Sequence, residues 1–129
     1  MVTRDVSGGS SGMRDSDPTV LFVDDEPELL DLYEVLYDAD FTVLTAESGE
    51  QAISMFGGHI DFAFFDRQMP ELTGGAAIRR LREEGYETPM GIISAVDPEG
   101  DLAVDHDAYF TKPPGREQIR ETVTQSLSE

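Results

Sequence analysis

The sequence contains no cysteine and no tryptophan, and only one of its nine basic residues is a lysine. Without cysteine, a disulfide framework, a thiolate metal site and a thiol nucleophile are all excluded. No apolar run approaches the roughly 18 residues that cross a bilayer, and no segment resembles a secretory signal. We therefore expect a cytoplasmic protein without membrane contact, whose 129 residues suffice for one domain with its own core.

Positive charge is scarce: the sequence has 9 basic and 27 acidic residues, which gives a net charge of −18. Such a surface repels phosphates, so we expect no direct binding of nucleic acid. Strong acidity can accompany disorder, but a hydrophobic fraction of 39% favours a globular chain. Adaptation to high salt, where the repulsion between carboxylates is screened, is our hypothesis for this composition.

Residues 1–18 are expected to form a flexible tail or an expression linker, because Val6–Met13 reads VSGGSSGM. Met13 is a candidate for the natural start. Residues 19–129 carry the pattern of one folded domain. The chain ends just after its last expected helix, which leaves open a free-standing domain or a piece of a longer protein.

Strand and helix signals alternate from Thr19 onward. Five segments rich in β-branched and aromatic residues predict strands, namely Thr19–Val23, Phe41–Ala46, Asp61–Asp66, Pro89–Ser94 and Ala108–Thr111. Five helices are expected between and after them, at Pro27–Ala39, from Ser48 to Gly58, from Thr73 to Gly85, from Asp97 to Asp105, and over a last segment with Ile119, Val123 and Leu127 on one stripe. In the first helix, the apolar residues Leu29, Leu32, Tyr33 and Leu36 follow the i, i+3, i+4, i+7 spacing of one helical stripe.

This alternation predicts an α/β protein with βαβ units and helices on both faces of a parallel sheet. The expected fold is flavodoxin-like and doubly wound, (βα)5, with five parallel strands in the order 2-1-3-4-5. Ligand sites of such sheets lie outside the carboxyl ends of the strands.

Chemically active side chains follow the predicted strands at those ends. Asp24, Asp25 and Glu26 follow the first strand, Asp66 ends the third, Ser94 ends the fourth and Lys112 follows the fifth. Clustered carboxylates repel one another and need a cation to coexist, and carboxylates with phosphate oxygens suit Mg²⁺. An aspartate can also form an aspartyl phosphate, for which one Mg²⁺ and one lysine neutralise the transferring oxygens.

Each of these residues also has a structural interpretation. Asp24 or Asp25 could cap the helix that begins near Pro27, and Asp66 could bond a loop amide. Lys112 could be a surface residue that survived by chance, although a chain that otherwise uses arginine suggests a need for a compact ammonium. Only the joint placement of these residues at one edge of the sheet favours a metal-binding and phosphoryl-accepting site over structural roles.

The segments VDDE (Val23–Glu26), DRQMP (Asp66–Pro70), Gly74, IIS (Ile92–Ser94) and YFTKP (Tyr109–Pro113) resemble, in order and spacing, the receiver domain of response regulators in two-component systems. Halophilic archaeal receivers resemble the chain most. The resemblance covers about residues 19–128 and implies a fold of flavodoxin type, a Mg²⁺ cofactor and no enzyme activity beyond the domain's own phosphorylation and slow dephosphorylation.

The resemblance also implies roles. Asp66 accepts the phosphoryl group from the phosphohistidine of a sensor kinase or phosphotransfer protein, while Asp25, Asp66, Asp24 and the backbone carbonyl of Gln68 hold Mg²⁺. Lys112 pairs with the phosphoryl oxygens, and Ser94 and Tyr109 are the switch pair that signals to a downstream output domain or protein. The bond between Lys112 and Pro113 is expected to be cis. Gln68 and Val96 are expected to tune the lifetime of the phosphate. His59 and His106 are expected to be surface or loop residues.

The chain departs from the family pattern in one region, and two rival functions are open. The segment from Ser94 to Lys112 is short, and Gly100 weakens the expected helix within it. An aspartate-nucleophile phosphatase is disfavoured, because Gln68 stands where its general acid would be. A phosphorylation-independent interaction module of the same fold is the alternative, and the kinase, the stimulus, the output and homodimer formation are left open.

Overall fold

The computed structural model describes residues 17–94, 108–111 and 116–127 of the 129. Its strands are β2 (Thr19–Val23), β3 (Thr42–Ala46), β4 (Phe62–Asp66), β5 (Met90–Ser94) and β6 (Ala108–Thr111). Its helices are α1 (Pro27–Tyr37), α2 (Gly49–Met55), α3 (Gly74–Glu83) and α4 (Arg116–Leu127). The expected helix from Asp97 to Asp105 and the expected tail up to residue 16 lie outside the described residues.

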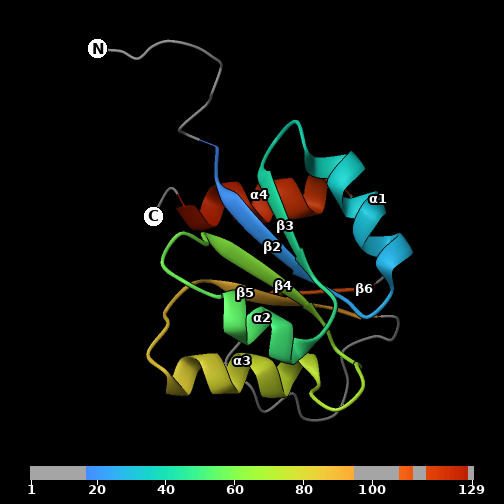
Figure 1. Cartoon of the computed structure of the whole chain (residues 1–129). Coiled ribbons are helices and arrows are strands. Elements are labelled where there is room, and N and C mark those ends of the chain that lie inside the picture. Colours follow the sequence, from blue (N-terminus) through green and yellow to red (C-terminus); the bar gives the residue numbers. More distant parts are fainter. Residues whose placement is uncertain (1–16, 95–107, 112–115, 128–129) are drawn as a thin grey trace.

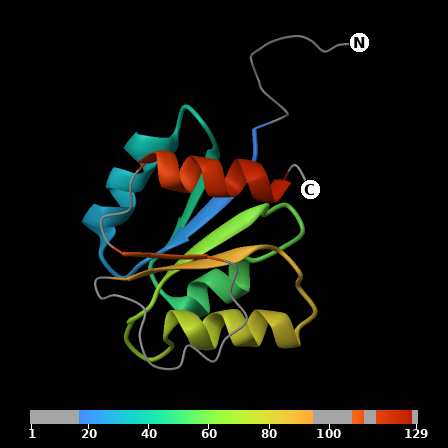
Figure 2. The same ribbon diagram turned by 180° about the vertical axis from the view of Figure 1, so that it is seen from behind.

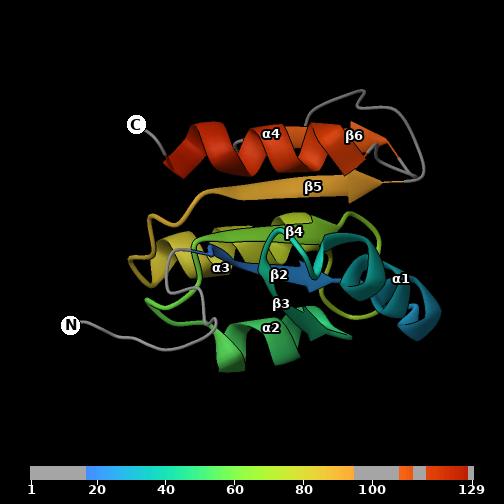
Figure 3. The ribbon, with the colours of Figure 1, turned by 90° about the horizontal axis from the view of Figure 1, so that it is seen from above.

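The five strands form one parallel sheet in the order β3-β2-β4-β5-β6 (Figure 3). This order places the first strand of the chain between the second and the third, as in a flavodoxin-like sheet. The predicted α/β class and the parallel sheet are thereby confirmed. A count of five helices stays a prediction, because the described residues contain four.

Helices cover both faces of the sheet (Figures 1 and 2). One core cluster joins α1 and α4 to alternate residues of the strands, among them Phe22 and Phe64. The other joins α2 and α3 to the intervening strand residues, such as Leu21 and Phe65. Since successive strand side chains point to opposite faces, each strand serves both clusters, and this explains the continuous apolar runs in the sequence.

The core face of α1 differs from the predicted stripe. The structure buries Leu30, Tyr33 and Tyr37, whereas Leu32 is 46% exposed. The spacing predicts the helix correctly, but of the four apolar residues in that stripe only Tyr33 is fully buried. Apolar residues occur on more than one side of this helix, so periodicity alone does not choose between neighbouring stripes.

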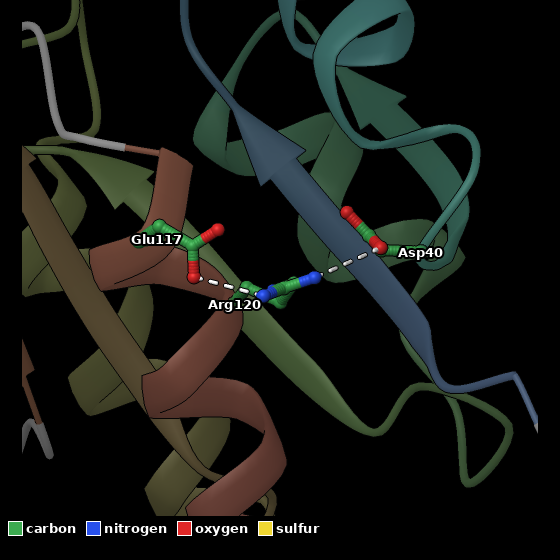
Figure 4. A network of polar contacts seen from close by, with 3 residues as sticks. All are labelled: Asp40, Glu117 and Arg120. Carbon is green, nitrogen blue, oxygen red and sulfur yellow. Dashed lines mark hydrogen bonds and ion pairs between the residues drawn. The ribbon is translucent and has the colours of Figure 1, made fainter.

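The last helix also departs from its predicted stripe. In α4, Ile119 and Val123 are fully buried, but Leu127 is 43% exposed. Leu127 is the last residue of α4, one turn beyond Val123. Arg120, on the outer side of the same helix, reaches Asp40 at 3.9 Å and Glu117 at 2.9 Å (Figure 4).

The helix ends follow local chemistry. Ser48 caps α2 by accepting a bond from the Gln51 N–H at 3.0 Å, and the Gln51 side chain accepts the Glu47 N–H at 2.7 Å. Ser48 and Gln51 thus form a variant of the capping box, in which the Gln51 side chain bonds the N–H of Glu47, the residue before the cap. Helix α2 ends at Met55, before the predicted end at Gly58.

Helix α3 is closed at its C-terminal end by a Schellman motif. Gly85 has φ of +101°, its N–H donates to the Arg82 carbonyl at 3.0 Å, and the Tyr86 N–H donates to the Leu81 carbonyl at 3.1 Å. Glycine suits this position, because other residues rarely adopt a positive φ. The predicted end at Gly85 agrees with this geometry.

Candidate functional site

The register of the sheet brings Asp24 and Asp66 together. Val23 is paired with Phe65 in the β2–β4 ladder, so the next residue on each strand is an aspartate. The Asp24 N–H donates to the Ala46 carbonyl at 3.1 Å, which holds the end of β2 against β3. Carboxylate oxygens of Asp24, Asp25 and Asp66 all lie within 4.8 Å of one another. The expected convergence of these three acids is confirmed.

Burial distinguishes this cluster from ordinary surface acids. Among the described residues, three polar or charged side chains are buried, with exposures of 2% for Asp24, 8% for Asp66 and 2% for Ser94. All three lie at the carboxyl ends of strands, Asp66 and Ser94 as the last strand residues and Asp24 directly after β2. Burying two neighbouring carboxylates is unfavourable unless a cation or hydrogen bonds offset their charge, so the cluster favours a cation site.

The capping interpretation of the acidic pair is wrong. The N-cap of α1 is Glu26, and it makes no side-chain capping bond. Asp24 instead accepts the backbone N–H of Glu26 at 3.0 Å through Oδ1. This bond fixes the Asp24 carboxylate above the end of β2, while Asp25 is exposed beside it.

The loop after Asp66 is tightly constrained. The Gly74 N–H donates to the Arg67 carbonyl at 3.1 Å, and the buried Met69 anchors the loop in the core. Glu71 has φ of 70°, and the Leu72 N–H donates to the Pro70 carbonyl at 2.7 Å around it. This combination is a γ-turn, which few non-glycine residues adopt. The loop thus returns the chain from Asp66 to α3 within a few residues.

Tyr33 is a neighbour of the site that sequence reasoning missed. It was expected only as a core residue of α1, and it is 3% exposed. Burial raises the pKa of its hydroxyl, and the Asp24 carboxylate raises it further, with contributions from Tyr37, Asp66 and Glu26. The signal available in the sequence was a tyrosine, rather than a purely apolar residue, in the helix that follows the acidic pair.

Ser94 is brought to the site by the β4–β5 ladder. Asp66 is paired with Ile93, and the Arg67 N–H donates to the Ile93 carbonyl at 3.3 Å, so Ser94 follows directly on the neighbouring strand. Ser94 is in turn paired with Thr111 of β6, the residue before Lys112 in the chain.

Several predicted positions are only partly described. The backbone of Tyr109 pairs with Ile92 in the sheet, whereas its side chain is not among the described parts of the structure. The residues wholly outside the described parts are Val96, His106, Lys112 and Pro113. Their roles, and the cis bond, therefore stay predictions. His59 is exposed, as expected, and so is Gln68, whose carbonyl remains a predicted ligand.

The donor set fits a hard cation. Three carboxylates supply oxygen atoms, and Mg²⁺ prefers one or two carboxylates together with water and phosphate oxygens. The same group of described residues contains no histidine, which disfavours zinc. Asp24, Asp25 and Asp66 would hold the ion, and Asp25 keeps the site accessible because it is exposed.

The chain matches the family model of the response regulator receiver domain over residues 20–124. A protein of Haloferax volcanii whose name describes a transcriptional regulator is 33% identical over 98% of this chain and 22% of its own length. Response regulator GtcR of Aneurinibacillus migulanus is 35% identical over 74% of this chain and 41% of its own. The chain thus spans less than half the length of these relatives.

Solved receiver domains share the fold. Response regulator TrrA from Thermotoga maritima, in complex with Mg²⁺ and BeF, has a TM-score of 0.76 and 25% identity and covers 85% of this chain and 99% of its own. The receiver domain of sensor histidine kinase PA1611 from Pseudomonas aeruginosa, with magnesium in its active-site cleft, has a TM-score of 0.78 and 24% identity over 88% of this chain and 100% of its own.

Helices of the described part are all too short or too polar to cross a membrane. The Haloferax relative agrees with the resemblance to halophilic archaeal receivers. The family match covers the strands and the helices that build the acidic edge, together with most of the chain. This chain belongs to the family of response regulator receiver domains of two-component systems.

Proposed function

We propose that this chain, with residues 19–129 as its receiver domain, accepts a phosphoryl group on Asp66 from a phosphohistidine donor in a Mg²⁺-dependent reaction. The observation that carries the proposal is the convergence of Asp24, Asp25 and Asp66 at the carboxyl edge of the sheet, with two of the three buried. The family and the magnesium-bound relatives support it.

The residues of the site divide the reaction between them. A carboxylate oxygen of Asp66 attacks phosphorus, the bond from phosphorus to the histidine nitrogen breaks, and the imidazole keeps the electron pair. Mg²⁺, when bound by Asp24, Asp25, Asp66 and the Gln68 carbonyl, supplies charge neutralisation for the transferring oxygens. Ser94 donates a hydrogen bond to one of these oxygens, and Lys112 pairs with another.

The exposed residues near Asp25 indicate where the phosphohistidine protein docks. Asp25 is exposed next to the first turns of α1, and an open groove there is lined by Asp25, Glu26, Pro27, Glu28, Leu29 and Leu32. On the same helix, Leu32 is 46% and Val35 is 78% exposed. Apolar side chains beside a reactive edge suit a protein donor with an apolar face, so a kinase or phosphotransfer protein docks on α1 in this proposal.

Phosphorylation then changes the charge at the edge. The phosphoryl group adds about one further negative charge and new acceptor oxygens, which draw Ser94 inward and allow Tyr109 to follow. The result is a change in which protein surface this domain binds. That surface belongs either to a separate cytoplasmic partner or to an output domain of the full-length protein. DNA binding, where the full-length protein has it, belongs to that other domain, because this chain carries a net charge of −18.

The test is the intact mass of the protein after incubation with acetyl phosphate and Mg²⁺ in high KCl. We expect the labile gain of one phosphoryl group, lost in Asp66→Asn and on removal of Mg²⁺. Asp31→Asn, which removes an exposed acid of α1 outside the cluster, is the matched control and should label normally. A folded protein that gains no mass would instead be a phosphorylation-independent binding module.

A further inference from the structure

Tyr33 carries a buried polar atom close to the acidic site. The residue lies in α1, is 3% exposed and stacks on Phe22 with ring centroids 4.6 Å apart. Its hydroxyl oxygen is buried and has no hydrogen-bond partner among the described residues. A buried hydroxyl without a partner is unfavourable, and phenylalanine would make the same ring contacts without this penalty. The hydroxyl therefore calls for an explanation beyond packing.

The position of the ring relates the hydroxyl to the carboxylates. Phe22 lies on β2 two residues before Asp24, which directly follows that strand, and Phe64 lies two residues before Asp66 on β4. Because successive residues of an extended chain alternate between the two faces, each pair projects toward the same face of the sheet. Helix α1 packs on that face through Tyr33. The carboxylates of Asp24 and Asp66 both act on the phenol, since each raises the pKa of its hydroxyl.

We propose that Tyr33 is a positioning residue of the acidic site, whose hydroxyl donates a hydrogen bond, through one bound water, to the Asp24 carboxylate. Buried waters typically bridge polar groups of this kind, and a carboxylate accepts several hydrogen bonds at once. Asp24 already accepts the Glu26 N–H through Oδ1, so the added bond holds the carboxylate from a second side.

The proposed hydrogen bond from Tyr33 should affect how tightly the site binds Mg²⁺. Groups that orient the ligands of a metal strongly affect its affinity, so loss of the Tyr33 hydroxyl should weaken Mg²⁺ binding by about tenfold. This consequence rests on the proposed function, because it takes the acidic cluster as the Mg²⁺ site. The hydrogen bond itself does not, since it exists in the metal-free protein.

The first experiment compares Tyr33→Phe with Tyr37→Phe. Tyr37 is also buried on α1, but it lies four residues further along the helix, about 6 Å from Tyr33 and away from the acidic end. Mg²⁺ affinity is measured by calorimetry, and the ultraviolet difference spectrum of the phenols is recorded on adding Mg²⁺. We expect weaker binding and loss of the phenol signal only in Tyr33→Phe. Equal behaviour of the two variants would overturn the proposal.

The second experiment needs neither metal nor phosphate. In a double-mutant cycle with Asp24→Asn, chemical unfolding is followed in the metal-free protein. Tyr33→Phe should lower the folding equilibrium constant about fivefold in the parent chain and by much less in the Asp24→Asn background. The same loss in both backgrounds would assign the hydroxyl a packing role and refute the proposal. This result is independent of whether Asp66 accepts a phosphoryl group.

Discussion

Gly74 lies directly against the backbone carbonyl of Asp66. A Cβ atom built on Gly74 would overlap that carbonyl oxygen and stand 3.1 Å from the Phe65 Cβ. The start of α3 therefore approaches the end of β4 so closely that no Cβ atom fits between them. This contact explains why a glycine follows the acidic strand end at this spacing, since any side chain would push the two elements apart.

Replacing Gly74 by alanine should disturb both the fold and the site. The added methyl group meets backbone rather than a flexible side chain, so we expect a loss of about 1–3 kcal/mol in the free energy of unfolding. Displacement of the Asp66 carbonyl should also slow phosphorylation by acetyl phosphate. Unfolding in urea and the rate of mass gain measure the two effects.

Gly58→Ala is the matched control for this substitution. Gly58 is exposed, and a Cβ built there meets no atom within 4 Å. The Gly58→Ala substitution should change the free energy of unfolding by far less than Gly74→Ala and leave the rate of phosphorylation unaltered. Equal stability of the two variants would contradict the close approach of α3 to β4.

Removing the cap of α2 should destabilise the protein modestly. The Ser48 hydroxyl accepts the Gln51 N–H at 3.0 Å, and no alanine side chain can replace that acceptor. We expect Ser48→Ala to cost about 1 kcal/mol. Ser54→Ala serves as the control, because the Ser54 hydroxyl only donates back to the Gln51 carbonyl within the helix. A larger loss in Ser54→Ala than in Ser48→Ala would rule out the capping role.

Salt should stabilise this protein. The net charge of −18 produces repulsion that is strongest at low ionic strength, where the screening length is long. The ion pairs of Arg120 act in the opposite direction, but Arg120 is 44% exposed and such pairs are worth about 0–1 kcal/mol. We therefore expect the melting temperature to rise steadily with KCl. A melting temperature that is flat or falls would count against the proposed adaptation to salt.

Mg²⁺ should stabilise the folded state through the acidic cluster. A ligand at ten times its Kd adds about 1.4 kcal/mol when it binds only the folded chain. We expect Mg²⁺ to increase the free energy of unfolding by this amount, measured by chemical unfolding at constant ionic strength. It should disappear in Asp25→Asn and persist in Asp31→Asn, since only Asp25 belongs to the cluster. A gain of the same size in both variants would indicate a nonspecific effect of the divalent ion.

The strands and the acidic edge were predictable from the sequence for a local reason. Buried parallel strands require continuous apolar runs, and chemically active residues collect where such strands end, so the positions of Asp24, Asp66 and Ser94 follow from strand polarity. The predicted bounds of β2 and β6 agree with the structure to the residue. The start of α2 at Ser48 and the end of α3 at Gly85 were likewise predictable, because the residues that produce them lie within one turn of the helix end.

The face that α1 turns to the core could not be predicted in the same way. Leu32 and Leu30 are equally apolar, yet the sheet covers Leu30 and leaves Leu32 exposed. The choice depends on how the helix is rotated on the sheet, and residues from other strands, such as Phe22 and Phe64, set that rotation by packing. The exposure of Leu127 at the end of α4 likewise depends on tertiary packing, which the apolar spacing of the helix does not specify.

The sequence alone thus determined the fold class, the acidic residues and the chemistry that they suit, because those properties depend on residue type and on order along the chain. Only the tertiary structure decided that Asp24 and Asp66 are buried while Asp25 is exposed, that Gly74 touches the Asp66 carbonyl, and that the Tyr33 hydroxyl is buried near the carboxylates. These relationships join residues from different elements, and packing between elements is not encoded in any local pattern.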